Sequence, residues 1–502
     1  MLFGGLNHDM NIDFNLPITL YNTEQIKTLE QFVIQEGLLS GFTLMERAGQ
    51  AVFEYIVHRY PTTKHISIFC GGGNNAGDGY IVGALALQAG LNVRVYSLSD
   101  INRLQNDALA AYEHYTNSGG RVVAFHKDVT FDEDELIVDA LLGTGLSRLV
   151  TEKYAQAINV INQSEQPVIS VDVPSGLHAD TGDVMGVAVQ ANATVTFIGI
   201  KQGLLTGFAA QYVGEIVYAS LALPKQAWQC VSSSVMRVTP KGLPRRPRYV
   251  HKGHFGHVLI IGGDVGYSGA ARLAGMAALR MGAGLVSIAT HPDNAAMMNI
   301  SCPELMCHSV ANATQLELLL EKASVIVVGT GLGQRDWGRE LGLAAVNSHK
   351  PMIVDADGLN LLAQSPRYQT HWILTPHVGE AARLLATTTH VIQQNRFDAI
   401  QALQQKYGGV ILLKGAGTLI AADNQIAISH TGNPGMASGG MGDVLAGVIA
   451  ALVAQGMSLE EAAKQGAYAH GIAADWAVKQ DGERGLLASD LLPYLRHWIN
   501  TH

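Results

Sequence analysis

The feature that most constrains the fold of this chain is a repeated alternation of short apolar runs with amphipathic stretches. Runs of β-branched and aliphatic residues recur along the 502 residues, as in HISIFC (65–70), ELIVDA (135–140) and HVLIIGG (257–263), and stretches of helical periodicity separate them. This alternation is typical of βαβ units, which build a mostly parallel sheet covered by helices. The 55 glycines suit the tight strand-to-helix loops of such a fold. The sequence therefore predicts an α/β protein with two or more domains.

A change in composition divides the chain. Between Leu223 and Lys252 the sequence is rich in Pro, Arg, Lys and Ser and has no sustained period, which is typical of a linker. No internal repeat relates the two halves, so we predict two different α/β domains, 1–228 and 229–502. Further strands are expected at 92–98, 121–125, 167–173, 193–199, 284–290, 324–329, 351–356, 372–375 and 409–415, with a hairpin at 417–429 and a helix at 443–455.

Charge and composition limit the partners of the chain. The formal net charge is −9 and the pI is near 6.1, whereas a nucleic-acid-binding surface needs clustered Lys and Arg. The longest apolar stretch, VLAGVIAALVA, is about half as long as a membrane-spanning helix. The four cysteines match no zinc or thioredoxin pattern, and the first residues lack the features of a secretory signal. We expect a soluble, cytoplasmic protein that binds neither nucleic acid nor membranes.

Polar side chains follow three strands of the first half. In an open parallel sheet, ligands bind beyond the carboxyl ends of the strands, where loops and helix N-termini meet. We therefore expect these polar residues to share one site. They are Asn74, Asn75 and Asp78 after the first strand, Asp139 at the end of another, and Asp172 and Ser175 after a third.

The first of these loops admits other interpretations. Gly71, Gly73 and Ala76 fit the weak pattern G-x-G-x-x-A, and Asp100 stands where a ribose-binding acid would be, so an NAD-dependent dehydrogenase is one alternative. Against it, a carboxylate at Asp78 would occupy the positive helix end that a pyrophosphate needs. Asp78 could instead be a simple N-cap, preceded by asparagines in left-handed turns.

The residue types at these strand ends indicate two kinds of chemistry. Asn75, Asp139 and Ser175 offer only oxygen donors with one formal negative charge, which suits a hard, weakly charged cation better than zinc. Asp172 lies between a β-branched run and a proline, where it is placed to transfer protons.

Four ordered motifs of the first half resemble the epimerase domain of the NAD(P)H-hydrate repair enzymes. The resemblance covers nearly the whole half. It implies a Rossmann-like three-layer domain that interconverts the two C6 epimers of hydrated NADH and NADPH. The motifs are LMERAG (44–49), GGGNNAGDGY (71–80), VDALLGTGL (138–146) and VDVPSGL (171–177).

The same resemblance implies roles for individual residues. Potassium would lie at Asn75, Asp139 and Ser175, and Asp172 would bind the hydrated cofactor and serve as acid or base. The family commonly has Gly where this chain has Ala76, and the methyl is tolerated only if the backbone does not need a positive φ there. The other implied contacts with the hydrated cofactor are Asn74, Asn75, Ala76, Gly77, Asp78, Gly143, Thr144, Gly145, Leu146, Ser147, Arg148 and Leu149.

A run of small residues opens a helix in the second half. The consecutive backbone N–H groups of Gly440, Met441 and Gly442 would form a cradle for phosphoryl oxygens, and Asp443 beside them can accept a hydroxyl proton. The alternative is a plain glycine-rich helix start capped by Asp443. No GxxxxGK[ST] motif is present, so the chain is not a P-loop protein.

Three more residues of this half accompany the cradle. Lys414 stands at a strand end, where it would contact a nucleotide phosphate, and Glu380 opens a helix, where it would hold magnesium through water. The GGMGD stretch resembles the anion hole of ribokinase-like enzymes. His377 stands where such kinases usually have Asn, which disfavours the alternative of a small-molecule kinase acting on a vitamin precursor.

Seven ordered motifs from Lys252 to the C-terminus resemble the ADP-dependent NAD(P)H-hydrate dehydratase domain, which is ribokinase-like. The resemblance implies that ADP, with magnesium, phosphorylates the C6 hydroxyl with Asp443 as base, after which phosphate leaves and the double bond returns. It implies nucleotide contacts at Lys414, Gly415, Ala416, Gly417, Thr418 and Gly442, and contacts with the hydrated cofactor at Ala271, Gly331, His377 and Asp443. The motifs are HKGHFGHVLIIGG, GYSGAARLAG, GTGLG, DADGLNLL, TPHVGE, KGAGT and ASGGMGDVLAG.

Together, the halves are expected to form a bifunctional isomerase and lyase. A chiral dehydratase site accepts one epimer, so the other accumulates unless it is interconverted. The implied small-molecule partners are hydrated NADH, hydrated NADPH and ADP, and we expect a homo-oligomer. The kinase, the dehydrogenase and a non-catalytic nucleotide-sensing protein stay open as alternatives.

Overall fold

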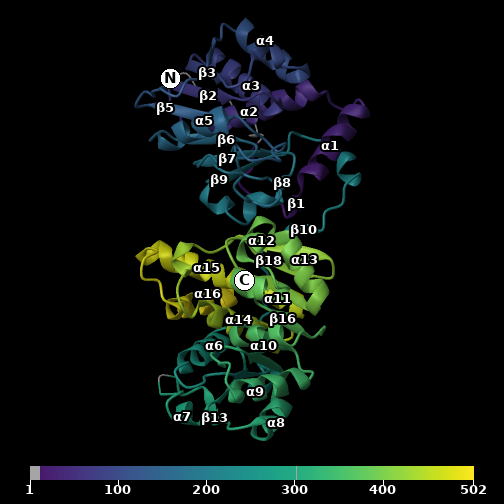
Figure 1. Cartoon of the computed structure of the whole chain (residues 1–502), viewed down its shortest axis with the longest axis vertical. Coiled ribbons are helices and arrows are strands. Elements are labelled where there is room, and N and C mark those ends of the chain that lie inside the picture. The colour runs from purple at the N-terminus through teal and green to yellow at the C-terminus, as the bar shows by residue number, and fades with distance from the viewer. Residues whose placement is uncertain (1–11, 301, 502) are drawn as a thin grey trace. The chain divides into compact units, whose positions relative to one another are not determined.

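The structure is a computed structural model that describes residues 12–300 and 302–501, and most of the stretch tested for a secretory signal lies outside them (Figure 1). The chain divides into two compact units, Met1–Val235 and Met236–His502. Both contain parallel sheets with helices, so the predicted α/β class is confirmed. Within the described ranges, no helix is long and apolar enough to cross a membrane.

The sheet of the first unit has seven parallel strands in the order β4-β3-β2-β5-β6-β7-β9. All six strands predicted for this half are present, whereas β9 was not predicted. Strands buried on both faces read as continuous apolar runs, which explains the sequence pattern. The strands are β2 (His65–Cys70), β3 (Asn92–Ser97), β4 (Val122–Ala124), β5 (Glu135–Ala140), β6 (Val168–Val171), β7 (Ala193–Phe197) and β9 (Glu215–Ala219).

Helices cover both faces of this sheet. Val138 of β5 belongs to an apolar core shared with α1 to α4, whereas its neighbour Ile137 belongs to a core shared with α5. Two short strands, β1 (Thr19–Tyr21) and β8 (Ile200–Lys201), do not belong to this seven-stranded sheet, and they pair in parallel. The helices are α1 (Thr23–Gln35), α2 (Gly41–Arg59), α3 (Asn74–Gln88), α4 (Asn106–Asn117) and α5 (Glu152–Gln163).

The strands of the second unit run parallel in the order β13-β12-β11-β14-β15-β16-β17, and the predicted hairpin follows as β18 and β19, paired antiparallel. Strand β13 was not predicted. The strands are β11 (His257–Ile261), β12 (Leu285–Thr290), β13 (Met306–Ser309), β14 (Val325–Val328), β15 (Met352–Val354), β16 (Trp372–Leu374), β17 (Val410–Leu413), β18 (Thr418–Ala422) and β19 (Gln425–Ser429); β10 (Val235–Arg237) spans the division between the units.

Helix α14 lies at the centre of the second unit. It packs on α6, α15 and the sheet, and because neighbours surround it, it is apolar on nearly every face. This enclosure explains the long apolar run of the sequence. The helices are α6 (Ser268–Arg280), α7 (Pro292–Ala295), α8 (Ala313–Lys322), α9 (Asp336–Asn347), α10 (Ala356–Gln364), α11 (Val378–Leu385), α12 (Thr389–Gln394), α13 (Arg396–Tyr407), α14 (Met441–Ala454), α15 (Leu459–Asp481) and α16 (Leu491–Thr501).

Candidate active sites

The glycine-rich loop of the first unit leads directly into α3. Gly73 is the N-cap, so no side chain accepts a capping hydrogen bond there, and the helix begins at Asn74. Asp78 therefore lies in the second turn, so its interpretation as an N-cap is wrong, as is that of asparagines in left-handed turns. Ala76 is fully buried and its φ is not positive, so an alanine can take the place of the family's glycine without backbone strain.

Asp139 is a fully buried carboxylate at the end of β5. Its Oδ1 accepts a hydrogen bond from Ser175 Oγ (2.5 Å), and its Oδ2 accepts from the backbone N–H of Ser175 (2.8 Å) and from Ser170 Oγ (2.8 Å). Burial raises the pKa of Asp139, although the bonds from Ser175 oppose the rise. In the described part of the chain, no basic side chain forms an ion pair with it.

Asn75 and Ser175 meet at the loop that follows Asp139. Ser175 Oγ accepts from the N–H of Leu142 (2.8 Å), and a Cβ on Gly143 would lie 3.3 Å from Asn75 Cγ. Asn75 Nδ2 is buried and has no hydrogen-bond partner among the described residues. The three predicted cation ligands thus lie around one loop. The buried Asp139 carboxylate, which has no cationic partner among the described residues, fits a monovalent cation there, and Asn75 would have to present its amide oxygen to it, not Nδ2.

Asp172 has the left-handed backbone of a strained residue, with φ at +65°. Its Oδ1 accepts from Lys201 Nζ, from Thr196 Oγ1 (3.2 Å) and from the N–H of Phe197 (3.1 Å). The Lys201 side chain is only 1% exposed, so this is a buried ion pair. The sequence analysis did not identify Lys201.

Two further carboxyls belong to this group. Burial raises the pKa of Asp78 well above its usual value, and the nearby charges of Asp172 and Glu30 raise it further. Burial also raises the pKa of Glu30, on α1, while Lys201 lowers it. Asn74, the first residue of α3 after the glycine-rich loop, is exposed. The predicted segment 143–149 forms an irregular loop whose last three residues are exposed.

The second site lies at the N-terminus of α14. Gly440 is its N-cap with φ at +90°, so Asp443 lies in the first turn and is not the cap. Lys414 Nζ lies 2.7 Å from Oδ1 of the buried Asp355. A Cβ on Gly442 would lie 3.2 Å from Asp355 Oδ2 and 3.3 Å from Lys414 Nζ, so the cradle approaches this pair closely.

The charges around the cradle are unequal. Burial raises the pKa of Asp443 to about 7; Asp355 adds to the rise and Lys414 opposes it. Burial disfavours the charged form of Lys414, but Asp355 and Glu380 outweigh that effect and raise its pKa. Glu380 Oε2 lies 3.8 Å from Lys414 Nζ. Three carboxyl groups therefore surround one ammonium group.

His377 and Glu380 cap α11 reciprocally. His377 Nδ1 accepts from the N–H groups of Gly379 (2.9 Å) and Glu380 (3.3 Å), and Glu380 Oε2 accepts from the N–H of His377 (2.8 Å). His377 Nε2 lies 3.4 Å from Glu380 Oε1, and the imidazole is 55% exposed. His377 therefore caps the helix while one edge of its ring stays open to a ligand.

The loop after β17 carries the predicted nucleotide contacts. Gly415 and Gly417 have positive φ, and a Cβ on Gly415 would lie 2.6 Å from Arg396 Nη1. Arg396 is buried and donates to the carbonyls of Leu413 (3.1 Å) and Lys414 (3.3 Å). It thus holds the loop from beneath. Neither Arg396 nor Asp355 was given a role from the sequence.

Ala271 and Gly331 belong to α6, which packs against α14, and to the loop after β14. Ala271 is buried in α6, and Gly331, with φ at +63°, lies where a Cβ would meet the carbonyl of Tyr267 at 2.6 Å. Thr330 Oγ1, in the same loop, is buried and lacks a partner among the described residues. These contacts join the loop to the start of α6. The same loop also reaches Asp355, since a Cβ on Gly329 would lie 1.8 Å from the Asp355 carbonyl oxygen.

Two family models match the chain. Residues 258–497 match the model described as NAD(P)H-hydrate dehydratase, and residues 41–203 match the model of the YjeF-related protein N-terminus. The bifunctional NAD(P)H-hydrate repair enzyme Nnr of Coxiella burnetii is 46% identical over 96% of this chain and 99% of its own length. The chain belongs to the family of bifunctional NAD(P)H-hydrate repair enzymes. The membership predicted from the motifs is confirmed.

Other relatives of the repair-enzyme family agree. The bifunctional enzyme Nnr of Escherichia coli is 42% identical, covering 97% of this chain and 95% of the relative. Among solved structures, the ADP/ATP-dependent NAD(P)H-hydrate dehydratase of Bacillus subtilis, co-crystallised with ATP and Mg²⁺, is 29% identical over 52% of this chain and 94% of that chain, with a TM-score of 0.48. Membership of this family favours repair over the vitamin-precursor kinase.

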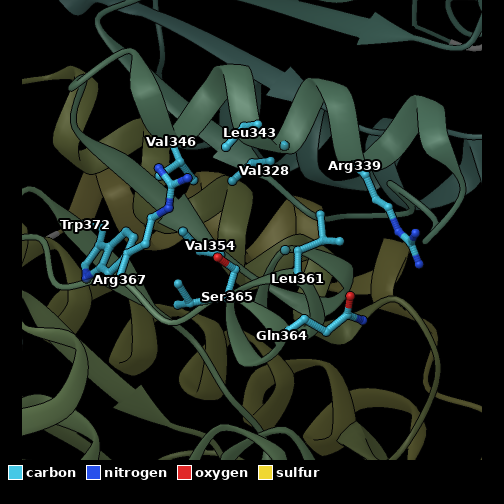
Figure 2. A pocket seen from close by; sticks show the side chains of 13 residues that line it. Val328, Arg339, Leu343, Val346, Val354, Leu361, Gln364, Ser365, Arg367 and Trp372 are labelled. Atoms are coloured by element: carbon cyan, nitrogen blue, oxygen red, sulfur yellow. The ribbon is translucent and has the colours of Figure 1, made fainter.

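One cavity of this repair-family chain lies apart from the predicted residues. It has a volume of about 290 Å³ and lies between α9 and α10, with Leu343 and Leu361 in its walls. Figure 2 shows Arg367 and Arg339 at opposite ends of it. None of the predicted site residues lines this cavity.

Proposed function

We propose that this chain repairs hydrated NADH and NADPH, with residues 1–228 as the epimerase and 229–502 as the ADP-dependent dehydratase. The observation that carries the proposal is Asp443, a partly buried carboxyl with a pKa of about 7 in the first turn of a helix that starts with unhindered N–H groups. A base with that pKa beside an anion cradle suits transfer of a phosphoryl group to an alcohol at neutral pH.

In the dehydratase unit, Asp443 takes the proton of the C6 hydroxyl while the oxygen of that hydroxyl attacks the terminal phosphorus of ADP. The C6–O–P bond forms and AMP leaves with the electrons of the broken P–O bond. The N–H groups of Gly440, Met441 and Gly442 stabilise the phosphoryl oxygens, because no side chain of the glycines hinders them. Phosphate then leaves C6, C5 loses a proton, and the double bond of the reduced nicotinamide is restored.

The remaining predicted residues would hold the two substrates. Lys414 and the loop to Thr418 would bind ADP, and His377, Ala271 and Gly331 would bind the hydrated cofactor. Magnesium would neutralise the phosphates. Asp355 and Glu380 suit it through bridging waters, since in the described residues no group of three His, Cys, Asp or Glu side chains forms a direct metal site.

In the epimerase unit, the C6 hydroxyl stands next to the ring nitrogen. Protonation of this hydroxyl lets water leave, and the lone pair of the nitrogen stabilises the positive charge that is left at C6. Water then adds to C6 from the other face and gives up one proton. Asp172 would accept and return that proton. Potassium at Asn75, Asp139 and Ser175 would hold the oxygen ligands of the loop in place.

The decisive experiment follows both epimers. Purified protein is incubated with hydrated NADH and ADP while the recovery of reduced-nicotinamide absorbance is recorded. We expect complete recovery by the parent, none by Asp443→Asn, and recovery limited to the directly accepted epimer by Asp172→Asn. A stable phosphorylated product would support the kinase instead, a requirement for a second carbonyl substrate would support the dehydrogenase, and ligand binding without any turnover would support a nucleotide sensor.

A cytoplasmic location and a homo-oligomeric state complete the proposal. The four cysteines are all free thiols, as a reducing compartment would leave them. Size-exclusion chromatography with light scattering tests the oligomeric state, and fractionation of cells tests the location.

A further inference from the structure

The interactions of Lys201 carry an inference that rests on the proposed epimerase function and deepens it. Lys201 lies on β8 opposite Tyr21 of β1. Its Nζ donates to Asp172 Oδ1, to Thr196 Oγ1 (3.2 Å) and to the carbonyl of Phe197 (2.9 Å). Three acceptors fix a side chain that is 1% exposed, so the ammonium group has one defined position.

The donors around Asp172 all bind one of its two oxygens. Lys201, Thr196 and the N–H of Phe197 donate to Oδ1, whereas Oδ2 accepts from no described residue. The Asp172 side chain is 15% exposed, so solvent or a substrate reaches it through Oδ2. A carboxylate anchored by one oxygen and open at the other is suited to accept a proton from a bound ligand.

Stability alone accounts poorly for this arrangement. Replacing a buried ion pair with apolar side chains is often neutral or stabilising. The left-handed backbone of Asp172 lowers the stability further. Features that lower stability and yet persist together cluster at functional sites.

The surrounding carboxyls give the pair a chemical role. Burial is the largest cause that raises the pKa values of Asp78 and Glu30. The charge of Asp172 raises both further, and Glu30 also raises the pKa of Asp78. In the described chain Lys201 forms its ion pair with Asp172 and with neither of the others. Because their pKa values are raised, Asp78 and Glu30 hold a proton more readily than ordinary carboxyls. They are therefore candidate donors beside the open oxygen of Asp172, and exchange of water at a single carbon requires both a donor and an acceptor.

We propose that Lys201 is a positioning residue of the epimerase site, which binds Oδ1 of Asp172, holds that carboxylate in one orientation and leaves Oδ2 to exchange the proton at the C6 oxygen. Lys201 touches no reacting atom and acts through Asp172. It lies inside the region matched by the N-terminal family model, whereas Glu30 lies before that region.

The test is a double-mutant cycle in the full chain. The variants are Lys201→Met, Asp172→Asn and the double substitution, with Lys27→Met on the exposed side of α1 as the matched control. Epimer interconversion is measured without ADP by chromatographic separation of the epimers. Dehydration of the S epimer with ADP serves as an internal reference. Asn tolerates the left-handed backbone, and the double variant contains no unpaired charge, so it is expected to fold even if Lys201→Met does not.

We expect Lys201→Met to lower kcat for epimerisation about 10²-fold with little change in KM, while Lys27→Met and the dehydration rate stay at the parental level. The double variant should be no slower than Asp172→Asn, because Lys201 acts only through that carboxylate. Multiplicative losses, or a Lys201→Met variant with parental kcat, would overturn the inference. A parent chain that interconverts no epimers would instead overturn the epimerase function itself.

If Lys201→Met does not fold, Thr196→Val takes its place in the cycle. It removes one donor to Oδ1 and one acceptor of the Lys201 ammonium while it keeps the volume of the side chain. We expect a roughly tenfold loss of kcat that disappears in the Asp172→Asn background. A loss that persists in that background would contradict the inference.

Discussion

Lys414 Nζ lies 2.7 Å from Oδ1 of Asp355, and this buried pair joins the ends of β17 and β15 beneath the N-terminus of α14. Because a side chain on Gly442 would touch both partners, the ion pair and the phosphate cradle form one structural unit. The charge of the proposed base Asp443 depends on the same two residues. Four of the predictions below follow from this unit and one from the cation site.

Gly442→Ala should narrow the cradle. The new Cβ would lie 3.2 Å from Asp355 Oδ2 and 3.3 Å from Lys414 Nζ, tighter than ordinary contacts, so the helix start must shift. We expect a roughly tenfold loss in kcat/KM for ADP. Gly439→Ala is the matched control, since a Cβ there meets nothing within 4 Å. Equal rates for the two variants would contradict a phosphate site at this turn.

The rate of dehydration should rise with pH through about 7. The base Asp443 is active when deprotonated, and its pKa is raised to about 7 by burial and by Asp355. At pH 5 we expect roughly a hundredth of the plateau in kcat/KM for the S epimer. The measurement is the initial rate from pH 5 to 9 with ADP. A profile without an acid limb would exclude Asp443 as the base.

Lys414→Met should move that acid limb to higher pH. Lys414 lowers the pKa of Asp443, so its removal leaves the carboxyl protonated to a higher pH. Binding of ADP should also weaken, and the buried Asp355 loses its partner, which lowers the free energy of unfolding by roughly 3 kcal/mol. Isothermal calorimetry, the rate profile and urea titration measure these effects. Lys479→Met, on the exposed face of α15, is expected to change none of them.

Asp443→Asn should stabilise the second unit above neutral pH. The folded pKa exceeds the unfolded one, so burial of the carboxyl becomes unfavourable as pH rises from about 4 to about 7, and the penalty persists above 7. Removing the ionisable group should raise the free energy of unfolding at pH 8 by roughly 1–2 kcal/mol and leave it unchanged near pH 4. The melting temperature should therefore rise at pH 8 and stay the same near pH 4. A lower melting temperature at pH 8 would show that the charge is not penalised in the folded state.

Exchange of potassium for choline should slow epimerisation. The buried Asp139 has no cationic partner in the described chain, so a bound cation would balance its charge. Asp139→Asn removes the negative charge that attracts the cation, so the variant should be slow in either salt. Sensitivity to choline in the variant equal to that of the parent would place the potassium elsewhere.

The larger part of the fold was predictable because its signal is local. The runs that form β2, β5 and β11 are buried on both faces and are therefore mostly apolar, and glycine marks the loop after each. Strands β1 and β8 have three and two residues, which is too short for any periodicity. The pairing that places Lys201 beside Asp172 was therefore invisible in the sequence.

The site residues divide in the same way. Asp172 and Asp443 stand in glycine-rich or proline-containing motifs, and these motifs make the two aspartates recognisable in the sequence. Arg396 and Glu30 occur in amphipathic helices, where charged residues usually face solvent, and only burial in the folded chain distinguishes them. Burial raises the pKa of Asp443 most, and Asp355, which is 88 residues away along the chain (443 − 355), raises it further. Separation of this kind gives no local pattern to read.

The pairing of β1 with β8 bears on how the first unit is trimmed for study. The match of the N-terminal family model begins at residue 41, after β1 and α1 have ended. A truncated version that starts at that border would leave β8 with an unsatisfied edge and would delete Glu30 from beside the lysine. The border of the family model and the border of a self-sufficient folding unit therefore differ by two elements.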